Sequence, residues 1–312
     1  MIISSSLHFV ASAPTVLALG CFDGVHLGHK AVIQQAKQQA QKLNCLCAVW
    51  SFAAPPKNFF VPGAVSLLTD RQQKADQMHR LGVDLFLCPP FDDEIAAYSA
   101  EDFFLNILLQ NLQVHHIVCG YNYTFGKGGK GTVSLLRSLC AAHKVRLTVL
   151  PPVSVQEKII SSSAIRAALS EGHPDDAASM LGRPYALCGI VIDGQKLARS
   201  LGFPTCNQRI SPDMTIPAHG VYVSRVHIKD KTDSFWGITN IGFRPTVGGS
   251  DIHMETHLFD FCEDLYEKEI CTEFIAYLRP EVPFNNLEEL SAQIKQDIQC
   301  AKKIIAEATQ YC

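Results

Sequence analysis

Two histidines three residues apart are the first residues whose type and spacing could carry chemistry. His26 and His29 flank Gly28, after the apolar run 16–19 and at the start of a helical pattern. The run predicts a short buried strand, and the pattern has its apolar stripe at Val32, Ile33, Ala36, Ala40 and Leu43. Free amides and the positive dipole end of a helix start favour an anion. The turn therefore predicts a phosphate site, although two surface histidines at a helix start would show the same spacing.

Two further stretches carry the groups that a triphosphate needs. Residues 120–131 read Gly-Tyr-Asn-Tyr-Thr-Phe-Gly-Lys-Gly-Gly-Lys-Gly, and residues 160–166 read Ile-Ser-Ser-Ser-Ala-Ile-Arg. Together they offer backbone donors, hydroxyls and the fixed positive charges of Lys127, Lys130 and Arg166. Alone, the first could be a flexible hairpin and the second an ordinary capped helix. Their joint occurrence with the histidine turn favours nucleotide binding.

Alternating strands and helices must position these three stretches. Strands are expected at 45–52, 83–87, 116–119 and 146–150, and helices at 69–81, 99–112 and 132–144, with a proline-broken loop at 53–62. This alternation predicts a doubly wound parallel sheet with helices on both faces. Ligands of such sheets bind beyond the carboxyl ends of the strands, where the histidine turn lies.

The pattern changes after residue 181. Short alternating runs at 220–228, 235–241, 255–261 and 270–277 are separated by turn signals, which predicts an antiparallel β-barrel. A terminal helix follows at 287–308, with Leu290, Ile294, Ile298, Ala301 and Ile305 on one face. The linker 172–184 is expected to hold a short helix. The fold class is thus α/β with an added barrel.

Composition narrows the class of protein. The chain has 312 residues, of which 47% are hydrophobic and 18% charged, so two packed domains are expected. The net charge of −3 gives no basic footprint for nucleic acid. We found neither a signal peptide nor a stretch long enough to span a membrane, which predicts a soluble, cytoplasmic protein without a membrane partner.

Twelve cysteines are present, but no two are spaced Cys-x-x-Cys. Several, including Cys88, Cys119 and Cys188, lie in strand-like runs where a free cysteine acts as a small hydrophobe. We therefore expect reduced thiols throughout.

At this point the chain resembles a known family. The histidine turn with residues 160–166 looks like a His-x-Gly-His nucleotidyltransferase, and the second half resembles a riboflavin kinase. The kinase motifs are Leu-Gly-Arg-Pro-Tyr at 181–185, Gly-Phe-Pro-Thr-Cys-Asn at 202–207, Asn-Ile-Gly-Phe-Arg-Pro-Thr at 240–246, Glu-Thr-His-Leu-Phe-Asp-Phe at 255–261 and Asp-Leu-Tyr at 264–266. In this order they resemble the bifunctional prokaryotic riboflavin kinase/FMN adenylyltransferase family, often called FAD synthetase.

The resemblance implies two ATP-dependent reactions in two domains. Residues 1–180 would form the FMN adenylyltransferase, and residues 181–312 the riboflavin kinase. Riboflavin would be phosphorylated to FMN, and FMN would then be adenylylated to FAD with release of pyrophosphate. ATP would be the co-substrate, Mg²⁺ the cofactor, and FMN and FAD the products.

For the kinase, the resemblance implies that Glu255 is the general base and that Thr205 and Asn207 hold Mg²⁺. It also implies contacts with ATP or flavin for Gly194, Lys196, Arg199, Gly202, Phe203, Pro204 and Arg244.

For the adenylyltransferase, it implies that His26 and His29 stabilise phosphate charge and that Arg166 holds the departing phosphates. Binding roles are implied for Gly20, Phe22, Asp23, Gly28, Asn122, Gly126, Ser161, Ser162 and Ser163.

The chain departs from the family pattern at a few positions. Asn122 replaces an aspartate, Thr124 stands where arginine is common, and Pro55 stands where a histidine is usual. Ala198 replaces a glycine of the kinase turn. A kinase with a degenerate first domain, a transferase acting on another acceptor, and a non-catalytic flavin-binding protein therefore remain alternatives, and the oligomeric state stays open.

Overall fold

The computed structural model describes the backbone of residues 1–194, 201–246 and 249–310, and within these the side chains outside 243–251 and 308–310. The chain divides into two compact units, Met1–Ser162 and Ser163–Cys312. This division lies earlier than the functional boundary predicted after residue 180, so α7 (Ser162–Ser170) and α8 (Pro174–Leu181) group with the second unit, apart from Ser162 itself. The boundary after residue 180 between the two expected domains stays a prediction.

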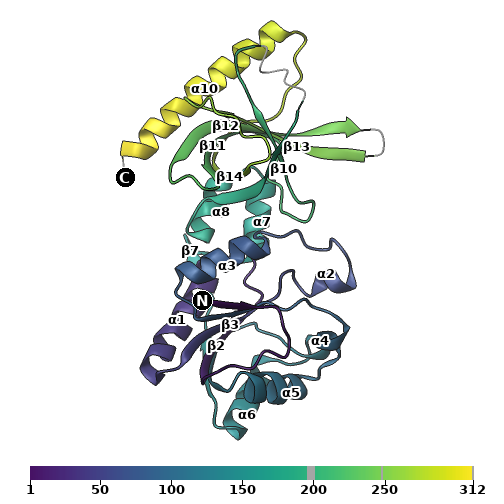
Figure 1. Cartoon of the computed structure of the whole chain (residues 1–312), viewed down its shortest axis with the longest axis vertical. Helices are drawn as coiled ribbons and strands as arrows, with labels where there is room; N and C mark the ends of the chain where they lie inside the picture. The colour runs from purple at the N-terminus through teal and green to yellow at the C-terminus, as the bar shows by residue number, and fades with distance from the viewer. Residues whose placement is uncertain (195–200, 247–248, 311–312) are drawn as a thin grey trace. The chain divides into compact units, whose positions relative to one another are not determined.

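The first unit is built on a six-stranded parallel sheet (Figure 1). Its order is β1-β4-β3-β2-β5-β6, with β1 Ile2–Ser4, β2 Thr15–Leu19, β3 Leu46–Trp50, β4 Leu85–Leu87, β5 Val114–Gly120 and β6 Arg146–Leu150. From β2 the chain adds β3 and then β4 on one side of this strand. It then crosses back and adds β5 and β6 on the other side of β2. The expected doubly wound sheet is confirmed, and the crevice at its reversal point opens beside the end of β2.

Alternate residues of each strand bury on opposite faces of this sheet. Val16 and Ala18 pack with α1 (Leu27–Leu43) and α3 (Arg71–Arg80). Leu17 and Leu19 pack with η1 (Phe103–Asn111) and α6 (Val133–Ala142). Short segments complete the unit: α2 Lys57–Phe60, α4 Asp93–Ala97, α5 Ala100–Asp102, η2 Lys127–Gly129, and a hairpin of β7 Ser154–Val155 and β8 Lys158–Ile159.

β1 pairs with β4, and its three residues give too short a run to be recognised in the sequence. Two local expectations need correction. The loop 53–62 contains α2. The single helix expected at 99–112 is α5 followed by η1, a π-helix whose wider turns no 3.6-residue pattern indicates.

The second unit is a closed antiparallel barrel in the order β10-β13-β12-β11-β14-β9. Its strands are β9 Tyr185–Ile192, β10 Cys206–Arg209, β11 Gly220–Ile228, β12 Ser234–Thr246, β13 Gly249–Leu258 and β14 Glu269–Arg279. Figure 1 shows α10 (Leu287–Gln310, yellow) running along the barrel. Its residues Ile294, Ile298 and Ala301 pack on Val221 and Ile238, as the apolar stripe predicted.

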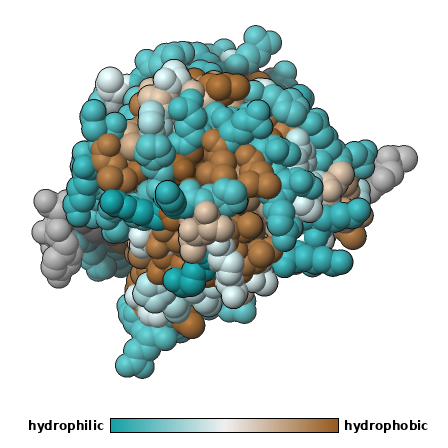
Figure 2. All heavy atoms as spheres, turned by 90° about the horizontal axis from the view of Figure 1, so that it is seen from below, coloured by the Kyte–Doolittle hydropathy of each residue, from teal (hydrophilic) through white to brown (hydrophobic). Residues whose placement is uncertain are grey.

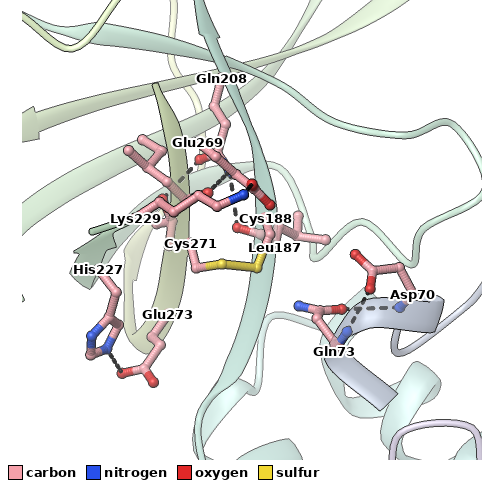
Figure 3. Close-up of a disulfide and its surroundings, with 12 residues drawn as sticks. Asp70, Gln73, Leu187, Cys188, Gln208, His227, Lys229, Glu269, Cys271 and Glu273 are labelled. Atoms are coloured by element: carbon pink, nitrogen blue, oxygen red, sulfur yellow. Dashed lines mark hydrogen bonds and ion pairs between the residues drawn. A yellow bond between two sulfur atoms is a disulfide. The ribbon is translucent and has the colours of Figure 1, made fainter. Parts of the chain in front are cut away.

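One pair of cysteines contradicts the expectation of reduced thiols. Cys188 of β9 and Cys271 of β14 form a disulfide (Figure 3). They lie opposite each other in the antiparallel register, with their Cα atoms 4.0 Å apart. Strand pairing brings together two residues that are 83 positions apart in the chain, which no Cys-x-x-Cys search detects. The expectation was wrong at this pair.

The lengths of the helices and the apolar surface bear on membrane and partner contacts. Among the helices that the structure describes, none is both long enough and apolar enough to cross a membrane. Figure 2 shows apolar atoms gathered in the middle of one face and bordered by hydrophilic ones. Apolar atoms contribute more than half of most protein surfaces, so this area assigns no partner.

Candidate active sites

The histidine turn begins α1, and its two rings are in contact. His26 is the N-cap, and its Nδ1 accepts a hydrogen bond from the backbone N–H of His29 at 3.2 Å. The imidazole rings stack with their centroids 3.5 Å apart and their planes 16° from parallel. Because Nδ1 of His26 accepts, it carries no proton in this arrangement. The cap therefore depends on a His26 ring that is unprotonated at this nitrogen.

The position of His29 disfavours its protonated form. Burial lowers the pKa of His29 well below its ordinary value of 6.5, and the charges of His26 and Lys74 lower this pKa further. Nδ1 of His29 is buried and has no hydrogen-bond partner among the described residues. The structure therefore favours a neutral imidazole at His29, and this residue lines the adjoining cavity.

Unusual backbone angles shape this turn. Phe22 and Val25 have positive φ angles of 50° and 42°, which L-residues seldom adopt. Gly20 has no side chain, and a Cβ there would lie 2.9 Å from the ring of Phe22. The turn thus needs glycine at position 20 to accommodate the Phe22 ring, which meets His29 edge to face at 5.2 Å.

Asp23, predicted to bind ATP or flavin, holds the turn in place. Its buried carboxylate accepts hydrogen bonds from the backbone N–H groups of Leu68 at 3.0 Å and of Thr69 at 3.2 Å. Asp23 is not among the residues that line the adjoining cavity. The structure therefore supports an anchoring role for Asp23. The family motif alone did not reveal that Asp23 holds the turn instead of lining the cavity.

A cavity of about 520 Å³ opens beside the turn, at the carboxyl ends of β2, β3 and β5. It brings together nine of the predicted residues, namely Gly20, Phe22, His26, Gly28, His29, Asn122, Gly126, Ser161 and Ser162. Ser162 also donates from its hydroxyl to the carbonyl of Asp23 at 2.9 Å. The three stretches identified from the sequence thus line one cavity, as expected from the architecture.

The sequence did not reveal the aromatic side of this cavity. It consists of Trp50, Phe52, Phe60, Phe91, Phe103 and Phe125. Phe52 and Phe91 meet edge to face at 5.2 Å, so the side chains form a continuous apolar wall. Aromatic residues just after strands were the available signal, but such residues are more often part of a core. The cavity accordingly has a polar end and an aromatic end.

Two predicted residues of the third stretch lie in the second unit. Ser163 and Arg166 belong to α7, whereas every residue that lines this cavity belongs to the first unit. Their roles toward the phosphates stay predictions.

A second cavity, of about 270 Å³, lies on the barrel beside α10. Its lining includes Phe203, Thr205 and Glu255, which were predicted, and Asn240, His257 and Arg279, which were not. Glu255 is paired through Oε1 with Nε2 of His253 at 2.5 Å, and His257 Nδ1 contacts the carbonyl oxygen of Pro204 at 2.8 Å. The Glu255 carboxylate therefore lines the cavity, and the imidazoles of His253 and His257 lie on the same strand, β13.

The predicted metal ligands lie close to this carboxylate. Asn207 of β10 pairs with Glu255 of β13 in the strand register. The side chain of Asn207 is buried, and its Oδ1 has no hydrogen-bond partner among the described residues. A Cβ at Gly194 would lie 1.9 Å from Nδ2 of Asn207, so glycine is required there. Thr205 lines both the second cavity and a further hollow of about 530 Å³ that includes Pro204.

The remaining predicted positions are only partly described. Gly202 has a φ of +87° and open space around it, which suits a turn next to a ligand. Lys196, Arg199 and the departure at Ala198 fall outside the described residues. Arg244 lies in β12, but its side chain is outside the described part.

Comparison with known proteins gives the same two-part division. A family model for FAD synthetase matches residues 9–164, and one for riboflavin kinase matches residues 181–305. A bifunctional riboflavin kinase/FMN adenylyltransferase of Listeria monocytogenes is 36% identical over 295 residues, covering 94% of this chain and 93% of the relative. That of Escherichia coli K12 is 35% identical, covering 93% and 94%.

A solved structure shares the whole fold. A crystal structure described as a macrolide-efflux protein from Streptococcus pneumoniae aligns with a TM-score of 0.87 and 26% identity, over 96% of this chain and 98% of that one. Its description concerns that protein, and the likeness supports the fold of this chain.

Proposed function

Because the chain belongs to the family of bifunctional riboflavin kinase/FMN adenylyltransferases, we propose that each of its two cavities carries one of the family's reactions. The protein phosphorylates riboflavin to FMN and adenylylates FMN to FAD, using ATP in both steps. The observation that supports this assignment is the gathering of predicted residues in each cavity. The histidine turn lines one, and Glu255 with Thr205 lines the other.

In the proposal, the cavity of the first unit performs adenylyl transfer. Its aromatic wall takes the flavin ring and its histidine end takes the phosphates. Its volume of about 520 Å³ lies within the usual range for small-molecule sites. A phosphate oxygen of FMN attacks the α-phosphorus of ATP, and the bond from that phosphorus to the bridging oxygen breaks, releasing pyrophosphate. His26, His29 and the amides at the start of α1 stabilise the developing negative charge.

The cavity of the second unit performs phosphorylation. Glu255 accepts the proton of the ribityl 5′-hydroxyl, whose oxygen attacks the γ-phosphorus of ATP, and ADP leaves. His253 holds the Glu255 carboxylate from one side. This step needs positioning and charge neutralisation more than covalent chemistry from the protein.

Asn207 and Thr205 would hold Mg²⁺ in this site. An amide oxygen and a hydroxyl suit a hard cation, and the buried, unpartnered Oδ1 of Asn207 fits a ligand that needs a partner. When bound, Mg²⁺ supplies neutralisation of the ATP phosphates. Removing the metal with EDTA should abolish FMN formation, and adding Mg²⁺ back should restore it.

The proposed partners are the small molecules riboflavin, FMN and ATP, with no nucleic acid. The cytoplasmic location stays a prediction, and the oligomeric state stays open.

The experiment that tests both assignments follows the flavins by chromatography after incubation with riboflavin, ATP and Mg²⁺. We expect FMN and then FAD. Glu255→Gln should lower FMN formation about 10²- to 10⁴-fold while still converting added FMN to FAD. His29→Asn should lower FAD formation about 10²- to 10³-fold and spare FMN formation. If the wild-type protein forms FMN but never FAD, only the kinase activity is present and the first domain is inactive. If it binds flavin without consuming ATP, it is a non-catalytic flavin-binding protein.

A further inference from the structure

A lysine lies fully buried beneath the histidine turn. Lys74 of α3 has no exposed surface, and the structure gives its Nζ no carboxylate partner within the described residues. A buried ammonium without a carboxylate is costly, so such residues are rare unless other groups compensate them. None of the sequence motifs pointed to this residue.

Two backbone carbonyls at the ends of neighbouring strands hold the ammonium. Nζ donates to the carbonyl of Phe52 at 2.6 Å and to that of Cys21 at 3.2 Å. Cys21 follows β2 and Phe52 follows β3, and both line the cavity of the first unit. The hydroxyl of Ser51 also donates to the carbonyl of Cys21, at 2.6 Å. Lys74 therefore ties the histidine turn to Phe52 of the aromatic wall.

The same helix start secures the other side of the turn. Thr69 donates from its backbone N–H to the carboxylate of Asp23, and its Oγ1 accepts from the N–H of Gly24 at 3.0 Å. Positive φ angles such as those of Phe22 and Val25 persist only where surrounding contacts enforce them. Removing the tie from Lys74 would release the turn on the side that faces the cavity.

Lys74 also supplies positive charge where the turn has little of its own. Nδ1 of His26 is unprotonated in the cap, and the pKa of His29 is lowered by burial, by His26 and by Lys74 itself. Phosphates that bind at the turn therefore meet a His26 ring without a proton on Nδ1 and a His29 ring that resists protonation. The buried ammonium is a fixed cation behind them, in a region of low dielectric where a charge acts strongly.

We propose that Lys74 is a positioning residue for adenylyl transfer, which fixes the histidine turn against the aromatic wall and places a permanent positive charge behind it. This rests on the adenylyl-transfer function assigned to that cavity. Lys74 does not touch the substrate in this role, since it does not line the cavity. It acts through Cys21, Phe52 and the electrostatic field at His29.

The test compares Lys74→Met, which keeps the stem and removes the ammonium, with Lys74→Arg, which keeps a charge. Lys37→Met is the matched control, because Lys37 is a part-buried lysine of the same unit paired with Asp84 at 3.4 Å. Lys74→Met should lower kcat for FAD formation at least about tenfold. Lys37→Met should leave it unchanged, and Lys74→Arg should retain more of it than Lys74→Met. FMN formation by each preparation shows that the second unit is intact.

A second readout separates charge from simple packing. In NMR titrations of the histidine rings, the midpoint of His29 should rise in Lys74→Met, because a nearby positive charge is gone, and should not move in Lys37→Met. A folded Lys74→Met protein with wild-type kcat and an unchanged His29 midpoint would overturn the proposal. If Lys74→Met fails to fold, Lys74→Gln, which also lacks the charge, takes its place: a loss of kcat of at least about tenfold supports the proposal, and wild-type kcat with an unchanged His29 midpoint overturns it. A wild-type protein without FAD formation would refute the function itself.

Discussion

At the residue scale, the proposed phosphate site is built on the stacked rings of His26 and His29. The rings contact each other, one caps α1, and the other is shielded from solvent at Nδ1. Protonating both would place two positive charges 3.5 Å apart between ring centroids. The protonation of His29 therefore depends on pH in a way that can be measured.

This dependence predicts a loss of stability in mild acid. The folded-state pKa of His29 lies below 6.5, so below pH 6.5 the unfolded chain binds a proton that the folded chain does not. The free energy of unfolding should therefore fall as the pH drops from 6.5 toward the folded-state pKa. Thermal melts between about pH 7.5 and about pH 5.5, a range that brackets the ordinary pKa of histidine, would measure the slope.

Replacing His29 should remove part of this dependence of the unfolding free energy on pH. His29→Asn should lose less stability over the same pH range than the wild type, whereas His79→Asn, at an exposed position in α3, should keep the wild-type slope. Some slope should remain in either variant, because burial and Arg146 also lower the pKa of His116. Identical slopes for His29→Asn and wild type would contradict the assignment.

At the element scale, the glycine-rich loop after β5 is shaped by close backbone contact. Gly126 has a φ of +70°, and a Cβ there would lie 2.6 Å from the backbone of Ala100. Gly128 has a similar φ of +64° but open space around it. The two glycines thus separate the cost of the backbone angle from the cost of contact.

We expect Gly128→Ala to destabilise the first unit by roughly 1–2 kcal/mol through its backbone angle. Gly126→Ala should cost a further 1–3 kcal/mol, roughly, through overpacking against α5. It should also reduce FAD formation, because Gly126 lines the cavity. Denaturant unfolding of both variants measures the difference. Equal losses would show that the contact with Ala100 relaxes without cost.

The strand pair β9 and β14 gives a second prediction at this scale. The Cys188–Cys271 disulfide should stabilise the barrel, since it closes a long stretch of chain in the unfolded state. Replacing both cysteines by alanine should lower the free energy of unfolding by roughly 2–5 kcal/mol. A reductant should lower the unfolding midpoint of the wild type to that of the double variant and leave the double variant unaffected. Insensitivity of the wild type would mean that the pair is not oxidised in solution.

At the scale of the whole molecule, the two proposed sites lie in separate compact units, and FMN is the product of one and the substrate of the other. This predicts that variants defective in one site complement each other. Neither His29→Asn nor Glu255→Gln alone should convert riboflavin efficiently to FAD. A mixture of the two should do so, with a lag while free FMN accumulates.

As a control for carry-over, each variant is incubated separately with riboflavin and ATP, the proteins are removed, and the two product solutions are then mixed. No FAD should form in this mixture. A mixture that forms FMN but no FAD, while FMN added from outside is converted, would mean that FMN stays bound to the protein that made it.

The amino-acid sequence by itself determined the parallel sheet followed by a barrel, the histidine turn, and the stretches within 120–131 and 160–162 that line the first cavity. These rest on local order, because a strand followed by a capped helix or a short motif is written in neighbouring residues. Tertiary structure decided the rest. Lys74 meets Cys21 and Phe52, Cys188 meets Cys271, and Asp23 holds Leu68 and Thr69, each across a long stretch of chain. Such contacts depend on strand order and register, so only the folded chain shows which buried charge or thiol has which partner.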